Sequence, residues 1–299
     1  MIQSLSRPWQ RLLPGLSIFY LDDLRPELGN KGYKLPPILE DAVRQGCSTI
    51  VSVGGRWSNH ILALAQLGNI YGLKTIGCIR GGAPLPLTAT LQDAEALGMQ
   101  LEFLAYSEYR NHRQSDFITR IKQRFPDAYF VPEGGSCTLG VLGAERIAED
   151  LEQFAEPFSE LYVPLGTGGT LAGLVRGLRQ PCHVVGVSAL KKTLEQDNAI
   201  KTWIDQDAAP GVTYELVEET LFGGYGRCPG ALKAIMAEAN THFEVVLDPI
   251  YTSKCFAHAL ERRKVANDSR ERLVLHTGGL QGRRGFDLEI GVKPHYRRS

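Results

Sequence analysis

Short apolar, β-branched runs alternate with helical patterns along most of the chain. One such run, Ser48–Val53, stops at Gly54-Gly55 and is followed by apolar residues at helical spacing over Ser58–Tyr71. The same alternation predicts further strands at 75–79, 101–104, 129–131, 160–164, 183–188 and 272–276, and helices at 88–97, 116–124, 140–154 and from Leu171. Strands and helices that alternate in this way are typical of βαβ units, so the sequence predicts an α/β fold with parallel sheets.

Glycine is over-represented, with 32 in 299 residues against an average share of about 7%. Six Gly-Gly pairs occur, at 54–55, 81–82, 134–135, 168–169, 223–224 and 278–279. Three predicted strands, at 48–53, 160–164 and 272–276, run directly into a glycine-rich turn. Because ligands of open α/β sheets bind beyond the carboxyl ends of the strands, these turns indicate where a site lies.

Composition and missing motifs exclude several classes of protein. Lys and Arg total 33, and so do Asp and Glu, which argues against a nucleic-acid protein with a strongly basic surface. The sequence has no Gly-Lys pair, no H-E-x-x-H and no metal-ligand spacing among its seven histidines, so we expect no Walker A loop and no metal site. No run of 18 apolar residues occurs, and the six cysteines are dispersed. We therefore expect a cytoplasmic protein with free thiols that binds neither membrane nor nucleic acid.

The segment Gly166-Thr167-Gly168-Gly169-Thr170 lies between a predicted strand and a predicted helix. Converging peptide N–H groups, two threonine hydroxyls and the positive end of the helix dipole suit a phosphate. The segment is not the dinucleotide motif G-x-G-x-x-G, because Leu171 stands where the third glycine belongs. A tight strand–helix turn without a ligand is the alternative interpretation.

Two lysines, Lys31 and Lys34, open another helical pattern directly after Gly29-Asn30. Most lysines are solvated surface residues, and that interpretation stands for either one alone. A Lys at a helix start, however, feels the positive end of the helix dipole, which lowers its pKa and favours it as a nucleophile and Schiff-base former. Lys34, one turn later, acts on Lys31 in the same direction.

The segment Gly54–His60 also leads from a strand into a helix. Its peptide N–H groups, with Ser58 and Asn59, suit a carboxylate, while ordinary capping of the helix by either residue is the alternative. His60 taken alone fits a structural role better than a catalytic one.

Tyr225 and Tyr251 each stand beside residues that shape turns, in Gly223-Gly-Tyr-Gly226 and Pro249-Ile-Tyr-Thr252. The simpler interpretation of each is a packed ring with an outward hydroxyl. As a pair they would instead line a pocket and act on protons.

Together these segments resemble the 1-aminocyclopropane-1-carboxylate deaminase / D-cysteine desulfhydrase family, whose members use pyridoxal 5'-phosphate (PLP). The resemblance covers roughly residues 20–285 and rests on six motifs in the family's order: G-N-K-x-x-K-L at 29–35, G-G-x-x-S-N-H at 54–60, G-T-G-G-T at 166–170, G-Y-G at 224–226, L-D-P-I-Y-T-S-K at 247–254 and H-T-G-G at 276–279.

The resemblance implies the tryptophan-synthase-β-like fold (PLP fold type II), with two open, twisted parallel-sheet domains flanked by helices and the cofactor in the cleft between them. Residues 1–44 and 143–299 would form the larger, PLP-binding domain, and residues 45–142 the smaller α/β domain. It also implies a homodimer.

The resemblance assigns roles residue by residue. Lys31 would form the Schiff base with PLP, and Gly166, Thr167, Gly168, Gly169 and Thr170 would hold its phosphate. Asn59 would contact the 3'-oxygen, and Thr277 the pyridine nitrogen. Ser58 would receive the substrate carboxylate and act in proton transfer, with Asn59, His60 and Tyr225 also at the substrate. Tyr225 and Tyr251 match the family's two active-site tyrosines.

Two positions favour the desulfhydrase branch. Deaminases of the family typically read Y-E-G-K and H-L-G-G, whereas this chain reads Tyr251-Thr-Ser-Lys254 and His276-Thr-Gly-Gly279. A neutral Thr at the pyridine nitrogen leaves the nitrogen unprotonated, which suits β-elimination better than ring opening. We therefore expect a lyase that converts a small, D-cysteine-like amino acid to a keto acid, ammonia and sulfide.

Other functions stay open at this point. A deaminase acting on 1-aminocyclopropane-1-carboxylate, a PLP-binding homologue without this turnover, and an unrelated enzyme with a phosphorylated ligand are the alternatives. The chain also departs from the family, with Gly32-Tyr33 where a basic residue is usual, Trp57 where Gln is usual and Leu280 in place of Pro. Arg56-Trp57 beside the expected carboxylate site would change the size and charge of the substrate pocket.

Overall fold

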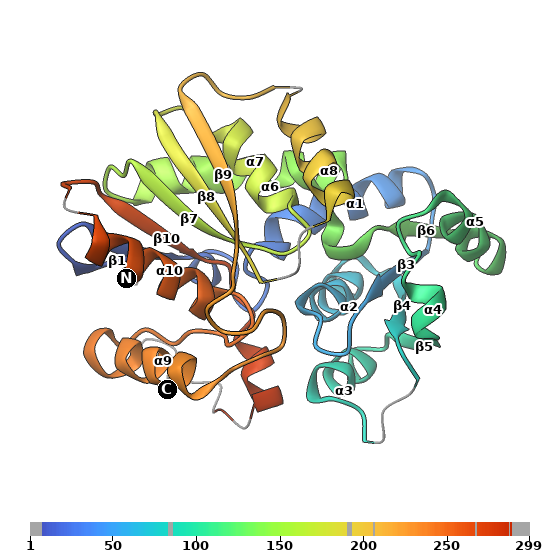
Figure 1. Ribbon diagram of the computed structural model, residues 1–299. Coiled ribbons are helices and arrows are strands. Elements are labelled where there is room, and N and C mark those ends of the chain that lie inside the picture. Colours follow the sequence, from blue (N-terminus) through green and yellow to red (C-terminus); the bar gives the residue numbers. More distant parts are fainter. Residues whose placement is uncertain are drawn as a thin grey trace, which may run out of the picture. The chain divides into compact units, whose positions relative to one another are not determined.

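The computed structural model describes residues 8–82, 86–189, 193–205, 207–266, 268–286 and 288. Contacts between Cα atoms group the chain into two units (Figure 1): unit 1 is Met1–Asn30 with Ala144–Ser299, and unit 2 is Lys31–Gly143. Each unit has a sheet of its own. This grouping assigns residues 31–44 to unit 2, and the domain boundaries at residues 45 and 142 stay a prediction.

Unit 1 is built on a six-stranded sheet of order β1-β2-β10-β7-β8-β9. The strands are β1 (Trp9–Leu13), β2 (Leu16–Tyr20), β7 (Glu160–Leu165), β8 (Cys182–Ser188), β9 (Val212–Glu218) and β10 (Arg272–His276). Neighbouring strands run parallel except β1, which pairs antiparallel with β2. The predicted parallel character holds for the sheet as a whole. The antiparallel β1 was not predicted; only Pro14 and Gly15 separate it from β2, and so short a turn reverses the chain.

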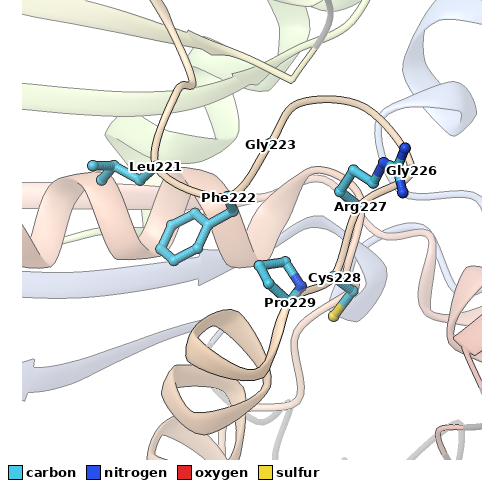
Figure 2. A pocket seen from close by; sticks show the side chains of 7 residues that line it. All are labelled: Leu221, Phe222, Gly223, Gly226, Arg227, Cys228 and Pro229. Atoms are coloured by element: carbon cyan, nitrogen blue, oxygen red, sulfur yellow. The ribbon is translucent and has the colours of Figure 1, made fainter.

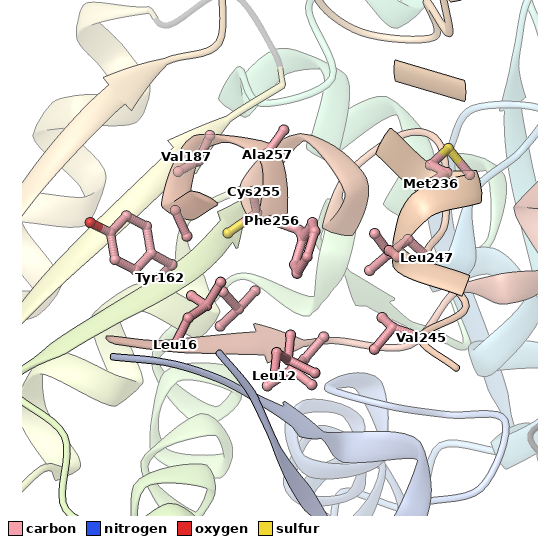
Figure 3. Packing of buried hydrophobic residues seen from close by; sticks show 14 of the residues in the cluster. Leu12, Leu16, Tyr162, Val187, Met236, Val245, Leu247, Cys255, Phe256 and Ala257 are labelled. Carbon is pink, nitrogen blue, oxygen red and sulfur yellow. The ribbon is translucent and has the colours of Figure 1, made fainter. Parts of the chain in front are cut away.

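Helices cover both faces of the sheet in unit 1. They are α7 (Gly169–Gly177), α8 (Leu194–Asp205), α9 (Gly230–Phe243), α10 (Thr252–Val265) and the part of α6 (Thr138–Phe154) that follows Gly143, with 3-10 turns at Leu21–Asp23 and Leu280–Phe286. Val185 and Val187 of β8 pack in one core with Phe256 of α10, seen in Figure 3, and with α9 residues such as Met236. Gly186 points to the other face, where a Cβ would lie 2.3 Å from Leu171 Cδ1 of α7. The missing side chain therefore lets α7 pack close to the sheet.

Unit 2 is built on a four-stranded parallel sheet of order β5-β4-β3-β6. Its strands are β3 (Thr49–Gly54), β4 (Lys74–Arg80), β5 (Gln100–Leu104) and β6 (Ala128–Val131). Its helices are α1 (Lys31–Arg44), α2 (Asn59–Tyr71), α3 (Ala89–Ala96), α4 (Tyr106–Tyr109) and α5 (Ser115–Arg124), with a 3-10 turn at Glu133–Gly135. Phe117 of α5 packs in one core with Val51 and Val53. Ser52, on the opposite face of β3, bonds α2 through His60.

The predicted strands and helices are all present, most of them within one or two residues of the predicted bounds. The sequence pattern did not single out β1, β2, β9, α4, α8, α9 or α10. Among the described residues, no helix is long and apolar enough to cross a membrane. All six cysteines carry free thiols.

Replacing Gly177 with Ala should destabilise unit 1. A Cβ there would lie 2.7 Å from the backbone oxygen of Glu145, so α7 would have to move away from α6. We expect a loss of about 1–3 kcal/mol in the free energy of unfolding, measured by urea denaturation. Gly230→Ala is the matched control, because nothing lies within 4 Å of its Cβ position at the start of α9. Equal stability of the two variants would contradict the close packing of α7.

Candidate active site

The loop at 166–170 joins β7 to the N-terminus of α7. Gly168 caps the helix with a left-handed φ of 96°, and a Cβ there would lie 2.3 Å from Ile200 Cγ1. The side-chain amide of Gln196 donates to the peptide oxygen of Gly166, which fixes the start of the loop. The first peptide N–H groups of α7 have no acceptor within the helix and lie at its positive end. The residues present therefore fit a phosphate group.

Asn30 ties this loop to the end of the neighbouring strand β10. Its side-chain Nδ2 donates to Thr170 Oγ1 at 2.9 Å, and its peptide N–H donates to the Thr277 oxygen at 3.2 Å. Gly29 allows the close approach, because a Cβ there would lie 2.1 Å from that same oxygen. Asn30 is a site residue that sequence reasoning missed, although its place in G-N-K, directly before Lys31, was a signal.

Thr277 follows β10, which pairs in parallel with β7. The two strands therefore end at the same edge of the sheet, and Thr277 lies beside the 166–170 loop. His276 is fixed below it, since its Nε2 donates to the Val246 oxygen at 3.0 Å and its Nδ1 accepts the Gly278 N–H at 3.2 Å. Asn30, Thr170 and Thr277 thus form one hydrogen-bonded group.

The two predicted tyrosines come together at this edge. The ring centroids of Tyr225 and Tyr251 are 6.0 Å apart, with an angle of 58° between the planes. A Cβ on Gly166 would lie 3.7 Å from the Tyr251 ring and 4.0 Å from its hydroxyl oxygen. Unit 1 therefore brings both tyrosines to the predicted phosphate loop.

An open hollow of about 610 Å³ borders the loop that carries Tyr225 (Figure 2). It is lined by Leu221, Phe222, Gly223, Gly226, Arg227, Cys228 and Pro229. Few side chains therefore contact this side of the loop, so contacts on its other side have to stabilise its conformation.

Thr252 has a structural task at the start of α10. The Asp248 carboxylate accepts the peptide N–H groups of Ile250, Tyr251 and Thr252 at 2.8–2.9 Å, and so caps the helix. The Thr252 hydroxyl donates to the same carboxylate and accepts the Asp248 N–H at 3.0 Å. Thr252 is fully buried, so its hydroxyl belongs to the cap.

Unit 2 contributes the two lysines. Lys31 is the first residue of α1, and burial lowers its pKa to about 8. The predicted direction of the shift is thus found, with desolvation as its cause. At this pKa about one amine in ten is neutral at pH 7, where an ordinary lysine is almost wholly charged.

Lys34 is almost completely buried, and its ammonium braces another glycine-rich turn. Its Nζ donates to the Gly134 oxygen at 2.8 Å and to Ser136 Oγ at 3.0 Å. Burial holds the pKa of Lys34 well below its usual value, and the charge of Lys31 adds to the effect. The turn at Gly134-Gly135 therefore binds the second lysine.

Ser58 caps α2, since its Oγ accepts the Ile61 N–H at 3.3 Å. This is the ordinary capping that the sequence left open, and it leaves the hydroxyl proton of Ser58 for another acceptor. Asn59 is the first residue of the helix and is partly exposed. Arg56 fastens the same turn, because its guanidinium donates to the Gly82 oxygen at 2.7 Å and its own oxygen accepts from Thr88 Oγ1 at 2.6 Å.

His60 is buried and held in one tautomer. Ser52 Oγ donates to the Val131 oxygen at 2.7 Å, so it must accept from His60 Nε2, which lies 2.8 Å away. The other nitrogen, Nδ1, has no hydrogen-bond partner among the residues that the structure describes. Burial lowers the His60 pKa to about 3, with a further contribution from Lys31 and Lys34. His60 is therefore a neutral imidazole at physiological pH.

The chain is similar to several known proteins. A family model described as "pyridoxal-phosphate dependent enzyme" matches residues 8–278. A putative 1-aminocyclopropane-1-carboxylate deaminase of Thermotoga maritima is 30% identical over 284 residues, which are 90% of this chain and 90% of the relative. The D-cysteine desulfhydrase of Serratia proteamaculans is 30% identical over 280 residues, 86% of this chain and 84% of the relative.

A solved structure described as an ACC deaminase homologue has a TM-score of 0.77 and 29% sequence identity. The alignment covers 90% of this chain and 85% of that one. The predicted fold class, tryptophan-synthase-β-like with PLP fold type II, is confirmed.

Replacing His60 with Gln should flatten the acid side of the stability profile. In the unfolded chain His60 binds a proton at a pKa of about 6.5, and in the folded chain only at about 3. The wild type therefore loses stability as the pH falls through this window. Gln keeps an N–H for Ser52 and cannot gain the proton. Between pH 7 and 5, urea unfolding of the apoprotein should show a loss about 2 kcal/mol larger for the wild type than for the variant. Equal losses would contradict a buried, neutral His60.

Proposed function

Because the chain belongs to the pyridoxal-phosphate-dependent enzymes, we propose that it is a lyase for a small amino acid of the D-cysteine type. One cysteine and one water would give a keto acid, ammonia and hydrogen sulfide. We also propose that it works in the cytoplasm, which its dispersed free thiols support, and as a homodimer, which the family resemblance supports.

The observation that carries this proposal is the state of Thr252. Deaminases of the family typically place Glu at this position of the Y-E-G-K motif. Here Thr252 is buried and its hydroxyl is shared with Asp248 in the cap of α10. Thr252 therefore presents no carboxylate to the site, and the neutral Thr277 would be the partner of the pyridine nitrogen. An uncharged ring suits the departure of a good leaving group such as thiolate.

The residues that would hold the cofactor are those of the motifs. Lys31 would bind it covalently, the N–H groups of the 166–170 loop would hold its phosphate, and Asn59 would contact its 3'-oxygen. PLP supplies an electron sink for the pair left behind when the α-proton is removed. The protein contributes binding, orientation and proton transfer.

Proton transfer falls to Lys31 and the two tyrosines. The pKa of about 8 gives Lys31 enough neutral amine to take the α-proton near neutral pH. Ser58 and the N-terminus of α2 would bind the substrate carboxylate. His60, the second residue of α2, is neutral and adds no charge next to this carboxylate site. Tyr225 and Tyr251, with rings 6.0 Å apart, would hold the leaving group and return a proton to it.

A second candidate is ring opening of 1-aminocyclopropane-1-carboxylate. The names of several relatives favour it, among them the putative 1-aminocyclopropane-1-carboxylate deaminase of Thermotoga maritima. Ser58 or one of the tyrosines would then have to assist a different first step.

The purified protein should show an absorbance band at about 410–430 nm that depends on Lys31. Lys31→Ala should remove the band, because the amine proposed to bind the cofactor covalently is then missing. Lys233→Ala, an exposed lysine of α9, is the matched control and should keep it. A colourless wild type that does not respond to added PLP would overturn the assignment.

A substrate panel should separate the two branches. With D-cysteine, L-cysteine, serine analogues and 1-aminocyclopropane-1-carboxylate, we expect sulfide and keto acid in equal amounts from D-cysteine and the highest kcat/KM for it. Keto acid from the cyclopropane substrate without sulfide from either cysteine would establish the deaminase instead. A coloured protein that turns over none of them would indicate a PLP-binding homologue.

A further inference from the structure

The loop that carries Tyr225 has little conformational restraint of its own. It joins Glu218, the end of β9, to Gly230, the start of α9. Gly223, Gly224 and Gly226 all have a left-handed φ, of 80°, 79° and 70°. Because glycine has the freest backbone, such a loop needs contacts from outside it to hold one tyrosine position.

Two buried side chains hold the loop: Lys254 of α10, which lies outside it, and Glu219, its first residue. The Glu219 carboxylate accepts the Phe222 N–H at 2.6 Å and the Gly224 N–H at 3.2 Å. Lys254 Nζ donates to the Gly224 oxygen and lies 3.4 Å from Glu219 Oε2. Both polar groups of Gly224 are thus held by the pair, and Tyr225 is the next residue.

Lys254 also lies on the element that positions the second tyrosine. It stands in the first turn of α10, three residues after Tyr251, and α10 is fixed at this end by the Asp248 cap. Both side chains of the pair are nearly inaccessible, at 1% and 2% exposed. A positive charge in the first turn of a helix is unfavourable, and its burial adds to the cost, so the lysine needs Glu219 and the Gly224 oxygen.

We propose that the buried Glu219–Lys254 ion pair is a positioning device that sets Tyr225 against Tyr251 for proton transfer in the proposed reaction. The inference rests on the proposed function in that it assigns the tyrosines a catalytic task. Neither member of the pair touches the substrate, and both act through Gly224.

The first test needs no activity. Arg227 is exposed in the same loop and is a site for trypsin. Lys254→Met and the nearly isosteric Glu219→Gln should each speed cleavage after Arg227 at least tenfold in the folded protein. Arg272→Lys is the control, because it weakens another buried ion pair of unit 1. In that pair Arg272 Nε lies 3.0 Å from Glu160 Oε2, at the start of β10 and away from this loop. Unchanged cleavage in both loop variants, or equal acceleration in the control, would overturn the proposal.

The second test is a double-mutant cycle on sulfide release. Lys254→Met and Glu219→Gln should lower kcat tenfold or more and change KM less than threefold, with the absorbance band of the cofactor retained. In a Tyr225→Phe background the same substitutions should lower kcat by less than threefold, because their effect passes through Tyr225. Fully additive losses would show a general structural role and contradict the proposal. Wild-type inactivity on every substrate, with trypsin protection as expected, would refute the proposed function and leave the loop anchor standing.

Discussion

Asn30 holds two neighbouring strand ends of unit 1 together, and the site depends on this contact. Its amide reaches Thr170 in the loop after β7, and its peptide N–H reaches Thr277 after β10. Because β7 and β10 run parallel, their ends already share one edge of the sheet. The contact fixes Asn30, the residue before Lys31, relative to the 166–170 loop that we propose for the phosphate and to Thr277, proposed at the pyridine nitrogen. Gly29 makes the approach possible, since any side chain there would collide with Thr277.

Buried charges are the second constraint. Burial lowers the pKa of Lys31, Lys34 and His60 in unit 2; the charge of Lys31 lowers the pKa of Lys34 further, and both lysines lower that of His60. Hydrogen bonds to Gly134 and Ser136 offset the desolvation cost of the Lys34 amine. His60 avoids that cost because it is neutral and bonds to Ser52. Lys254 in unit 1 is buried in the same way and relies on Glu219. Lys34 and Lys254 each donate to a peptide oxygen in a glycine-rich turn, Gly134 and Gly224, which relates the glycine excess to the polar interior.

The sequence predicted the alternation of strands and helices because β-branched runs and helical spacing are local signals. It also placed the glycine-rich turns at strand ends, and Ser58 at a helix cap. It could not show the contacts of Asn30 with Thr170, of Lys34 with Gly134 or of Glu219 with Lys254. These partners lie 140, 100 and 35 residues apart, and no local pattern reports such contacts. The hairpin of β1 and β2 was missed for a different reason, since two five-residue strands around Pro14-Gly15 carry little periodicity. The sequence also could not show that the Thr252 hydroxyl is bonded to Asp248, a contact that keeps this motif residue in the helix cap.

The central claim is that Lys31 is the residue that binds the cofactor. Borohydride reduction of the PLP-loaded protein, followed by peptide mass mapping, tests it most directly. We predict that the reduced cofactor is found on Lys31, with Lys34 unmodified because its amine is held by Gly134 and Ser136. A label on Lys34 or Lys254, or no label on any lysine, would contradict the account.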